Sequence, residues 1–160
     1  MGRGVASPPR GGRWERLAHL EAVPLVGGEA AVREPWRAKR ACAMHEWSLA
    51  TGVVRAAEEE ARRRGASRVF SVVVAAGFRT GVVPELLVRA FEAAREGTLL
   101  EGASLAVEVE PLRLRCRSCG AETEEESFLL ACRRCGGQEV EVQSGDGLVL
   151  RSLELEIPDG

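Results

Sequence analysis

Apolar residues between positions 46 and 64 recur at steps of three and four, which places them on one face of a helix. The repeating positions are Trp47, Ala50, Val54, Ala57 and Ala61. Glutamates at 58–60 each precede an arginine at 62–64 by four residues, the order that favours ion pairs along a helix. The pattern predicts a helix over 46–64 with a solvated charged face, and Gly65 favours its termination.

A run of β-branched and small apolar residues follows at 69–76, which is typical of a strand with both faces covered. Residues 77–81 begin and end in glycine and predict a turn. Pro84 suits the first turn of a second helix, and Gly97 suits its end. We expect the core-facing stripe of this helix to consist of Leu87, Ala90, Phe91 and Ala94.

Strand patterns return in the second half of the chain. Leu105, Val107 and Val109 alternate with polar or small residues, and Leu153, Leu155 and Ile157 do so near the end. The alternation changes phase near Arg151–Ser152, which predicts a bulge. Residues 122–126 are predicted to be an acidic loop, and residues 128–130 and 140–142 to be short strands.

Two CxxC motifs dominate the chemistry of the chain. Their four cysteines are Cys116, Cys119, Cys132 and Cys135. Two such turns at this spacing can direct four thiolates at one ion, and Zn(II) favours that closed tetrahedral set. Unrelated surface cysteines, two disulfides or an iron site are the alternatives. Cys42 has no motif around it and is interpreted as incidental.

The elements together predict an α+β fold: two helices packed on a three-stranded sheet, with an inserted four-cysteine zinc-ribbon-like module. We expect residues 44–112 and 146–158 to form one domain and residues 113–145 to form the zinc-binding domain. The module is too small for a core of its own, so zinc would supply much of its folding free energy.

Residues 1–43 differ from the rest of the chain. They contain eight Lys and Arg against four Asp and Glu, whereas residues 44–160 contain fourteen against twenty. Glycine and proline are frequent and no period is sustained, so we expect a disordered extension. A basic arm for an acidic partner and a solvated tail are two interpretations. We favour a third, in which translation begins at Met44.

Composition excludes several functional classes. The chain is 45% hydrophobic, as globular proteins are, but it contains no apolar run that could span a bilayer. The start of the chain lacks the apolar segment of a secretory signal. Cysteines without an export signal indicate a reducing, cytoplasmic environment. Residues 44–160 contain one histidine and no nucleophile with a nearby base, so we expect no enzyme activity.

Several motifs occur together in one order: Met44-His45-Glu46 at a helix start, the turn at 77–82, Phe91-Glu92 with Gly97-Thr98, and the two CxxC motifs followed by Ser144-Gly145. In this order they resemble the HypA/HybF family of nickel metallochaperones for [NiFe]-hydrogenase maturation, from residue 44 to about residue 157. Phe78, where relatives often have glutamate, and Arg133, where they often have proline, depart from the family pattern.

The resemblance implies a structural Zn(II) and a transient Ni(II) cargo. Family members are thought to hold nickel with the terminal amine, the adjacent histidine and main-chain amides. Carried over, the donors are the Met44 amine, the His45 imidazole and amide, and the Glu46 amide. Such an all-nitrogen set suits Ni(II). An internal Met44 has no free amine, so either residues 1–43 are a misassigned start, or they are cleaved, or nickel binds more weakly and with other donors. We expect translation to begin at Met44.

The resemblance also implies partners: the GTPase HypB, the hydrogenase large-subunit precursor and, in some relatives, urease maturation proteins. A zinc-ribbon module that binds nucleic acid or protein is the alternative, because arginines gather near the CxxC motifs. Those arginines are Arg113, Arg115, Arg117, Arg133 and Arg134. The acidic residues between the motifs and the lack of stacking aromatics argue against nucleic acid.

Overall fold

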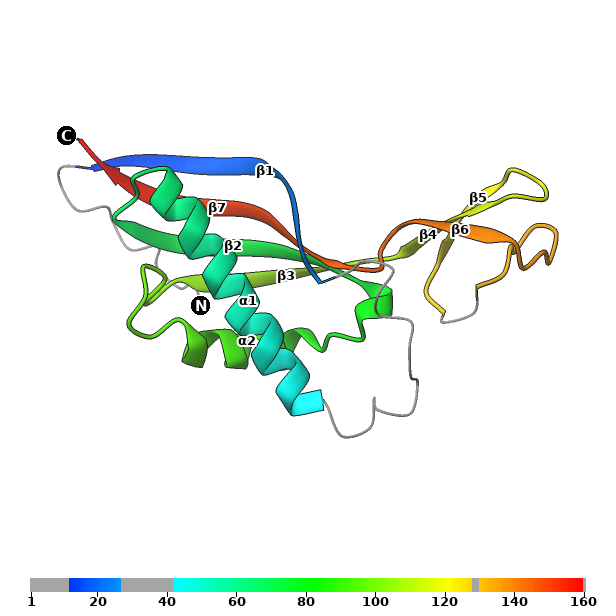
Figure 1. Ribbon diagram of the computed structural model, residues 1–160, viewed down its shortest axis with the longest axis horizontal. Coiled ribbons are helices and arrows are strands. Elements are labelled where there is room, and N and C mark those ends of the chain that lie inside the picture. Colours follow the sequence, from blue (N-terminus) through cyan, green and yellow to red (C-terminus); the bar gives the residue numbers. More distant parts are fainter. Residues whose placement is uncertain (1–11, 27–41, 128–129, 160) are drawn as a thin grey trace, which may run out of the picture.

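The computed structural model describes residues 12–26, 42–127 and 130–159. It contains a larger sheet with two helices on one face and a smaller sheet that projects from one end (Figure 1). The elements are β1 (Gly12–Val26), α1 (Cys42–Arg63), β2 (Arg68–Gly77), a short 3-10 helix (Phe78–Thr80), α2 (Pro84–Ala94), β3 (Ser104–Glu110), β4 (Leu112–Cys116), β5 (Glu122–Glu125), β6 (Val140–Ser144) and β7 (Leu148–Pro158).

The larger sheet has the strand order β1-β7-β2-β3. β2 and β3 are parallel, and α2 forms the crossover between them. β7 returns antiparallel to β2, and β1 lies antiparallel on the other side of β7. The predicted architecture of two helices on a sheet of β2, β3 and β7 is therefore confirmed, with β1 as an additional strand.

The core lies between this sheet and the two helices, which also contact each other. Aliphatic side chains form nearly all of it, and Phe91 of α2 is its one large aromatic residue among those described. The predicted α2 stripe is confirmed: Leu87 and Phe91 are fully buried, and Ala90 and Ala94 pack against the core. An aliphatic core of this kind depends on close side-chain packing for its stability.

Helix α1 follows the predicted stripe with one exception. Ala50, Val54, Ala57 and Ala61 are buried, but Trp47 is 50% exposed. Trp47 therefore lies on the helix surface, and the prediction that it faces the core is wrong. The helix also begins earlier than predicted, at Cys42.

The charged run of α1 is only partly solvated. Arg62 pairs with Glu58 at 2.9 Å and Arg64 with Glu60 at 3.1 Å, as the spacing predicts. Arg63 pairs with Glu60 rather than with the predicted Glu59. Glu58 also accepts a hydrogen bond from the backbone N–H of Leu99 at 3.3 Å. This glutamate therefore ties α1 to the loop that precedes β3.

β1 is the largest departure from the sequence prediction. Residues 12–26 were expected to be disordered, but they form an extended strand paired with β7 from Gly12↔Pro158 to Val26↔Leu148. The pairing uses backbone N–H and C=O groups, so it needs no regular apolar pattern in β1. The outer edge of β7 supplies the partner N–H and C=O groups, and nothing in residues 1–43 indicates that this edge is available. Cys42 and Ala43 lie in α1, and the rest of the predicted extension lies outside the described residues.

The smaller sheet has the order β5-β4-β6, with both pairings antiparallel. Residues 122–126 were predicted to be a loop, but Glu122–Glu125 form β5. Glu122 and Glu124 of β5 lie opposite Arg115 and Arg113 of β4, so these two charges are met by arginine on the neighbouring strand. Of the strand predicted at 128–130, the first two residues lie outside the described ranges, and Leu130 has no regular structure.

The predicted bulge in the last strand is confirmed. Along the β2–β7 pairing, Val73 lies opposite Ser152 and Val74 opposite Leu150, so Arg151 has no opposite residue. The extra residue lets Leu150 and Leu153 both face the core, because it resets the inward–outward alternation. The exposed Arg151 instead pairs with Glu110.

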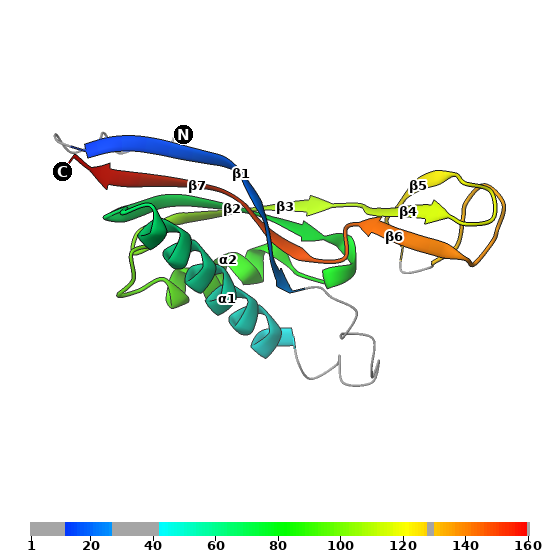
Figure 2. The same cartoon turned by 45° about the horizontal axis from the view of Figure 1, so that its top comes forward.

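The smaller sheet extends from one end of the larger sheet (Figure 2), and backbone segments of the two approach closely there. The N–H of Gly77 donates to the carbonyl of Gly147 at 2.8 Å, and the N–H of Arg79 donates to Gly145 at 3.3 Å. A Cβ on Gly77 would lie 2.1 Å from the Gly145 oxygen, and one on Gly145 would lie 2.3 Å from the Pro111 oxygen. Glycine is therefore required at both of these positions of the crossing, the end of β2 and the turn between β6 and β7.

Replacing Gly77 with alanine is expected to lower the free energy of unfolding by at least about 3 kcal/mol, the upper range for forced overpacking. The backbone of Gly77 is extended (φ −66°), so the loss would come from contact alone. Gly52→Ala is the matched control, since nothing lies within 4 Å of a Cβ at this position of α1. That variant should gain about 0.5–1 kcal/mol. Urea unfolding measures both, and equal effects would contradict the crowding at the crossing.

Candidate metal centre

The four cysteine sulfurs of the CxxC motifs lie within 4.8 Å of one another. The Sγ atoms of Cys116 and Cys135 are 3.6 Å apart, and so are those of Cys119 and Cys132. Each close pair therefore joins one motif to the other. All four cysteines are free, so the arrangement is a cluster of thiols and not two disulfides.

Each CxxC motif is folded by the same backbone hydrogen bonds. In the first, the N–H of Gly120 donates to the carbonyl of Cys116, and in the second the N–H of Gly136 donates to the carbonyl of Cys132. Both glycines have positive φ, near +72° and +73°, a conformation that glycine adopts without strain. The sequence placed glycine there because the chain must turn back beneath the sulfurs.

The two motifs differ in how the fold supports them. Cys116 is the last residue of β4, and its N–H donates to the Ala121 carbonyl in the β4–β5 hairpin. Cys132 and Cys135 lie on a connection between β5 and β6 that belongs to neither strand. The first motif therefore continues directly from a strand, whereas the second lies outside the strands.

The local environment gives the thiols different acidities. The N–H of Cys119 holds the pKa of Cys116 down at about 6, and the N–H of Cys135 lowers the pKa of Cys132. The N–H of Gly137 also lowers the pKa of Cys135. The sulfurs of Cys116 and Cys119 outweigh this effect and raise the pKa of Cys135 to about 11. The cluster thus ionises readily at first but retains a proton at neutral pH.

This donor set fits a tetrahedral metal ion. A zinc–sulfur bond of about 2.3 Å implies sulfur separations of about 3.8 Å, close to those between the motifs. A cation would also remove the repulsion that keeps Cys135 protonated. Four thiolates suit Zn(II) and iron alike.

Three of the five arginines near the cysteines lie beside acidic residues. Arg113 pairs with Glu124 at 2.9 Å, and Arg115 lies opposite Glu122 on one side and Glu141 on the other. Arg133 is paired as well, with Glu125. Charges of both signs alternate across the smaller sheet, which does not favour binding to a phosphate backbone.

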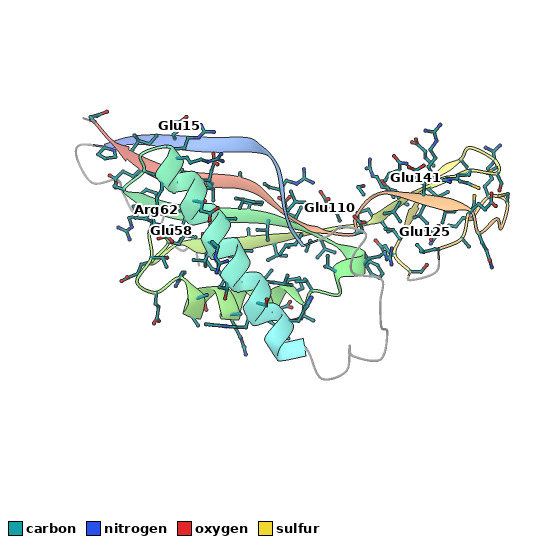
Figure 3. All side chains as sticks on the ribbon, in the orientation of Figure 1. Glu15, Glu58, Arg62, Glu110, Glu125 and Glu141 are labelled. Atoms are coloured by element: carbon teal, nitrogen blue, oxygen red, sulfur yellow. The ribbon has the colours of Figure 1, made fainter. Side chains whose placement is uncertain are left out.

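The smaller sheet contains a buried carboxylate that the sequence did not reveal. Glu125 of β5 is 3% exposed, and its Oε2 accepts a hydrogen bond from Nε of Arg133 at 2.7 Å. Figure 3 labels Glu125 in the module, together with Glu141. The acidic run at 122–126 concealed Glu125, because only the β4–β5 register shows which of its residues faces inward.

The second predicted metal site lies at the start of α1. Met44, His45 and Glu46 all fall within the helix, which begins two residues before Met44. His45 is exposed, whereas Glu46 is 2% exposed, and neither of its carboxylate oxygens has a hydrogen-bond partner among the described residues. In this arrangement the Glu46 carboxylate does not face outward toward a partner.

Most of the chain matches a known protein family. A sequence model described as "Hydrogenase/urease nickel incorporation, metallochaperone, hypA" matches residues 44–155. The chain belongs to the HypA family. The match begins at Met44 and includes the CxxC motifs, so it covers both candidate sites.

Individual HypA proteins align over nearly their whole length. Hydrogenase maturation factor HypA of Aquifex aeolicus is 40% identical over 114 residues, which is 71% of this chain and 99% of the relative. HypA of Chlorobaculum tepidum is 41% identical over 113 residues and is covered completely. The solution structure of the Ni metallochaperone HypA from Helicobacter pylori has a TM-score of 0.57 at 28% identity, covering 71% of this chain and 98% of that one.

These comparisons identify the chain as a member of a family of hydrogenase maturation and nickel-incorporation factors. Neither helix in the part of the chain that the structure describes is long and apolar enough to cross a membrane.

The pKa differences predict how zinc affinity depends on pH. Above pH 6 the Cys116 thiolate is already formed, so zinc need not displace its proton; below pH 6 it must. Affinity should therefore fall as the pH is lowered and fall more steeply below pH 6. Chelator competition between pH 5 and 8 measures this dependence, and a single unchanged slope across that range would contradict the lowered pKa of Cys116.

Proposed function

We propose that this HypA-family protein binds Ni(II) and delivers it to the large subunit of a [NiFe]-hydrogenase during maturation. The observation that carries the proposal is the family match, which begins at Met44 and so includes Met44-His45-Glu46. The protein acts by transferring cargo rather than by catalysis. It works with the GTPase HypB and docks on the hydrogenase precursor, and urease maturation proteins are further partners in some relatives.

The proposed nickel donors are the Met44 amine, the His45 imidazole and amide, and the Glu46 amide. The exposed His45 supports this assignment, because a carrier must take up and release its ion at the surface. An α-amine has a pKa of about 8, so nickel can displace its proton near neutral pH. The buried Glu46 carboxylate lies next to these donors without being one of them.

Residues that precede Met44 oppose this site in two ways. They convert its amine into an amide, and they extend α1 back to Cys42. In a helix, each N–H bonds to the carbonyl four residues earlier, so the Glu46 amide bonds to Cys42. When a chain begins at Met44, the first amides of the helix have no such partner and are free to bind nickel. We therefore propose that the active form begins at Met44.

The four-cysteine cluster is proposed to hold a structural Zn(II). Residues 113–145 would then form a zinc-binding domain, joined by the glycine crossing to a nickel-binding domain of residues 44–112 and 146–158. The gathering of four sulfurs within 4.8 Å, with separations of 3.6 Å between the motifs, supports a resident cation. We favour zinc over iron because the proposed structural role does not involve electron transfer. A colourless protein with one zinc per chain is expected.

A chain that begins at Met44 is expected to bind one Ni(II) and develop the yellow, diamagnetic character of a square-planar complex. The same chain with an acetylated amine should not develop this complex, and neither should a chain that begins at Met1, because both lack a free amine at Met44. Absorption spectroscopy during nickel titration measures the difference. Relatives that align over nearly their whole length with 71% of this chain support the folding of the shorter form.

His45→Ala in the chain that begins at Met44 should abolish this complex, since it removes the imidazole. Glu58→Gln, on the same helix but outside the proposed donors, should leave the complex intact. Equal nickel binding by the free and acetylated chains would contradict the amine donor. Failure of the Met44 form to restore hydrogenase activity in cells that lack their own HypA would contradict the delivery function.

A further inference from the structure

The second CxxC motif lies on a connection outside the strands, and one ion pair joins it to the sheet. Arg133 follows Cys132 directly, and its Nε donates to the Oε2 of Glu125 at the end of β5. We propose that Glu125 and Arg133 position the second CxxC motif, so that Cys132 and Cys135 are held in register with the first pair. Within the described ranges, no other side-chain ion pair links this motif to β5.

The burial of the two partners differs sharply. The Glu125 side chain is 4% exposed, whereas the Arg133 side chain is 68% exposed. Glu125 lies opposite Leu112 in the β4–β5 register, and Leu112 and Leu114 are fully buried. The carboxylate is therefore anchored in the interior of the module, while the arginine reaches it from the surface. The position of the arginine backbone, and with it the motif, is fixed from inside.

Glu125 depends on Arg133 as well. Its Oε1 is buried and has no hydrogen-bond partner among the described residues, so Arg133 supplies the one compensating contact. A buried carboxylate without a partner is strongly unfavourable. The module therefore resists any movement of the second motif that would separate the pair.

The position of Arg133 links the ion pair to the cysteine cluster. It lies between two cysteines of the cluster, so a displaced Arg133 displaces both sulfurs. Residues that orient metal ligands typically change metal affinity by about 10–100-fold when they are replaced. The pair would thus act on affinity and on the rate of metal release without touching the ion.

A simple electrostatic role predicts the opposite sign for Glu125. Four thiolates around Zn(II) carry net negative charge, so removing a nearby carboxylate would tighten zinc binding by charge alone. If Glu125 instead holds the motif in place through Arg133, its removal loosens zinc binding. The direction of the change in a Glu125→Gln variant therefore decides between the two roles.

The experiment measures zinc affinity and the rate of zinc release to a chromophoric chelator, using the full chain. Glu125→Gln and Arg133→Gln should each weaken zinc binding about 10–100-fold and speed its release. The double variant should be no weaker than the weaker single variant, because both remove one contact. Arg134→Gln is the matched control: it removes the same charge from the same motif and should change little.

Three results would overturn the proposal: tighter or unchanged zinc binding in Glu125→Gln, additive losses in the double variant, or an equal loss in Arg134→Gln. Glutamine matches glutamate in size, and Arg133 is mostly exposed, so neither variant opens a gap in the module. The inference depends on the proposed zinc site but not on nickel. A wild-type protein without zinc would defeat that site, whereas zinc-loaded wild type with unaffected variants would defeat only the positioning role.

Discussion

Four sulfur atoms held within 4.8 Å of one another repel once they ionise, and this repulsion affects how readily each thiol of the smaller sheet loses its proton. Backbone N–H groups relieve it for Cys116, whose pKa falls to about 6, but not for Cys135, whose pKa rises to about 11. The fold therefore favours the ionised form of Cys116, whereas Cys135 loses its proton only when a metal binds. Binding and folding of the module are consequently linked.

The larger sheet imposes a different constraint, because it must connect to this module without losing its own packing. Two glycines at the crossing let backbones approach where any side chain would collide. The hydrogen bonds of Gly77 and Arg79 with the chain that returns from the module fix the approach of the two sheets. The module is therefore attached through main-chain contacts, which leaves its surface side chains available for other roles.

Much of the fold could be predicted from the sequence because burial leaves a period. The stripes of α1 and α2, the strand at 69–76 and the bulge at Arg151 all follow from apolar spacing, and the structure bears them out. Trp47 broke the rule: it is half exposed, whereas Glu46 beside it is buried. β5 and the role of Glu125 were missed because a charged strand has no apolar period and its inward residue depends on register.

The candidate sites were predictable to different degrees. The CxxC spacing is a covalent property of the chain, so the sulfur cluster could be predicted from residues alone. The nickel site at Met44, His45 and Glu46 was predicted only through the family resemblance and stays a prediction, because its chemistry depends on where the chain begins and on helix hydrogen bonds. β1 could not be predicted, since strand pairing through the main chain places few demands on side chains.

The place of β1 has a consequence for the stability of the protein in solution. β1 covers the outer edge of β7, and a chain without it would leave that row of N–H and C=O groups open to other strands. The edge carries its own protection: Glu154 and Glu156 place charge on the face of β7 that does not pack on the core, the extra residue Arg151 bends the strand, and Pro158 offers no N–H at its end. A shortened chain would thus resist aggregation, because the charge and the bend of β7 disfavour pairing with strands of neighbouring molecules.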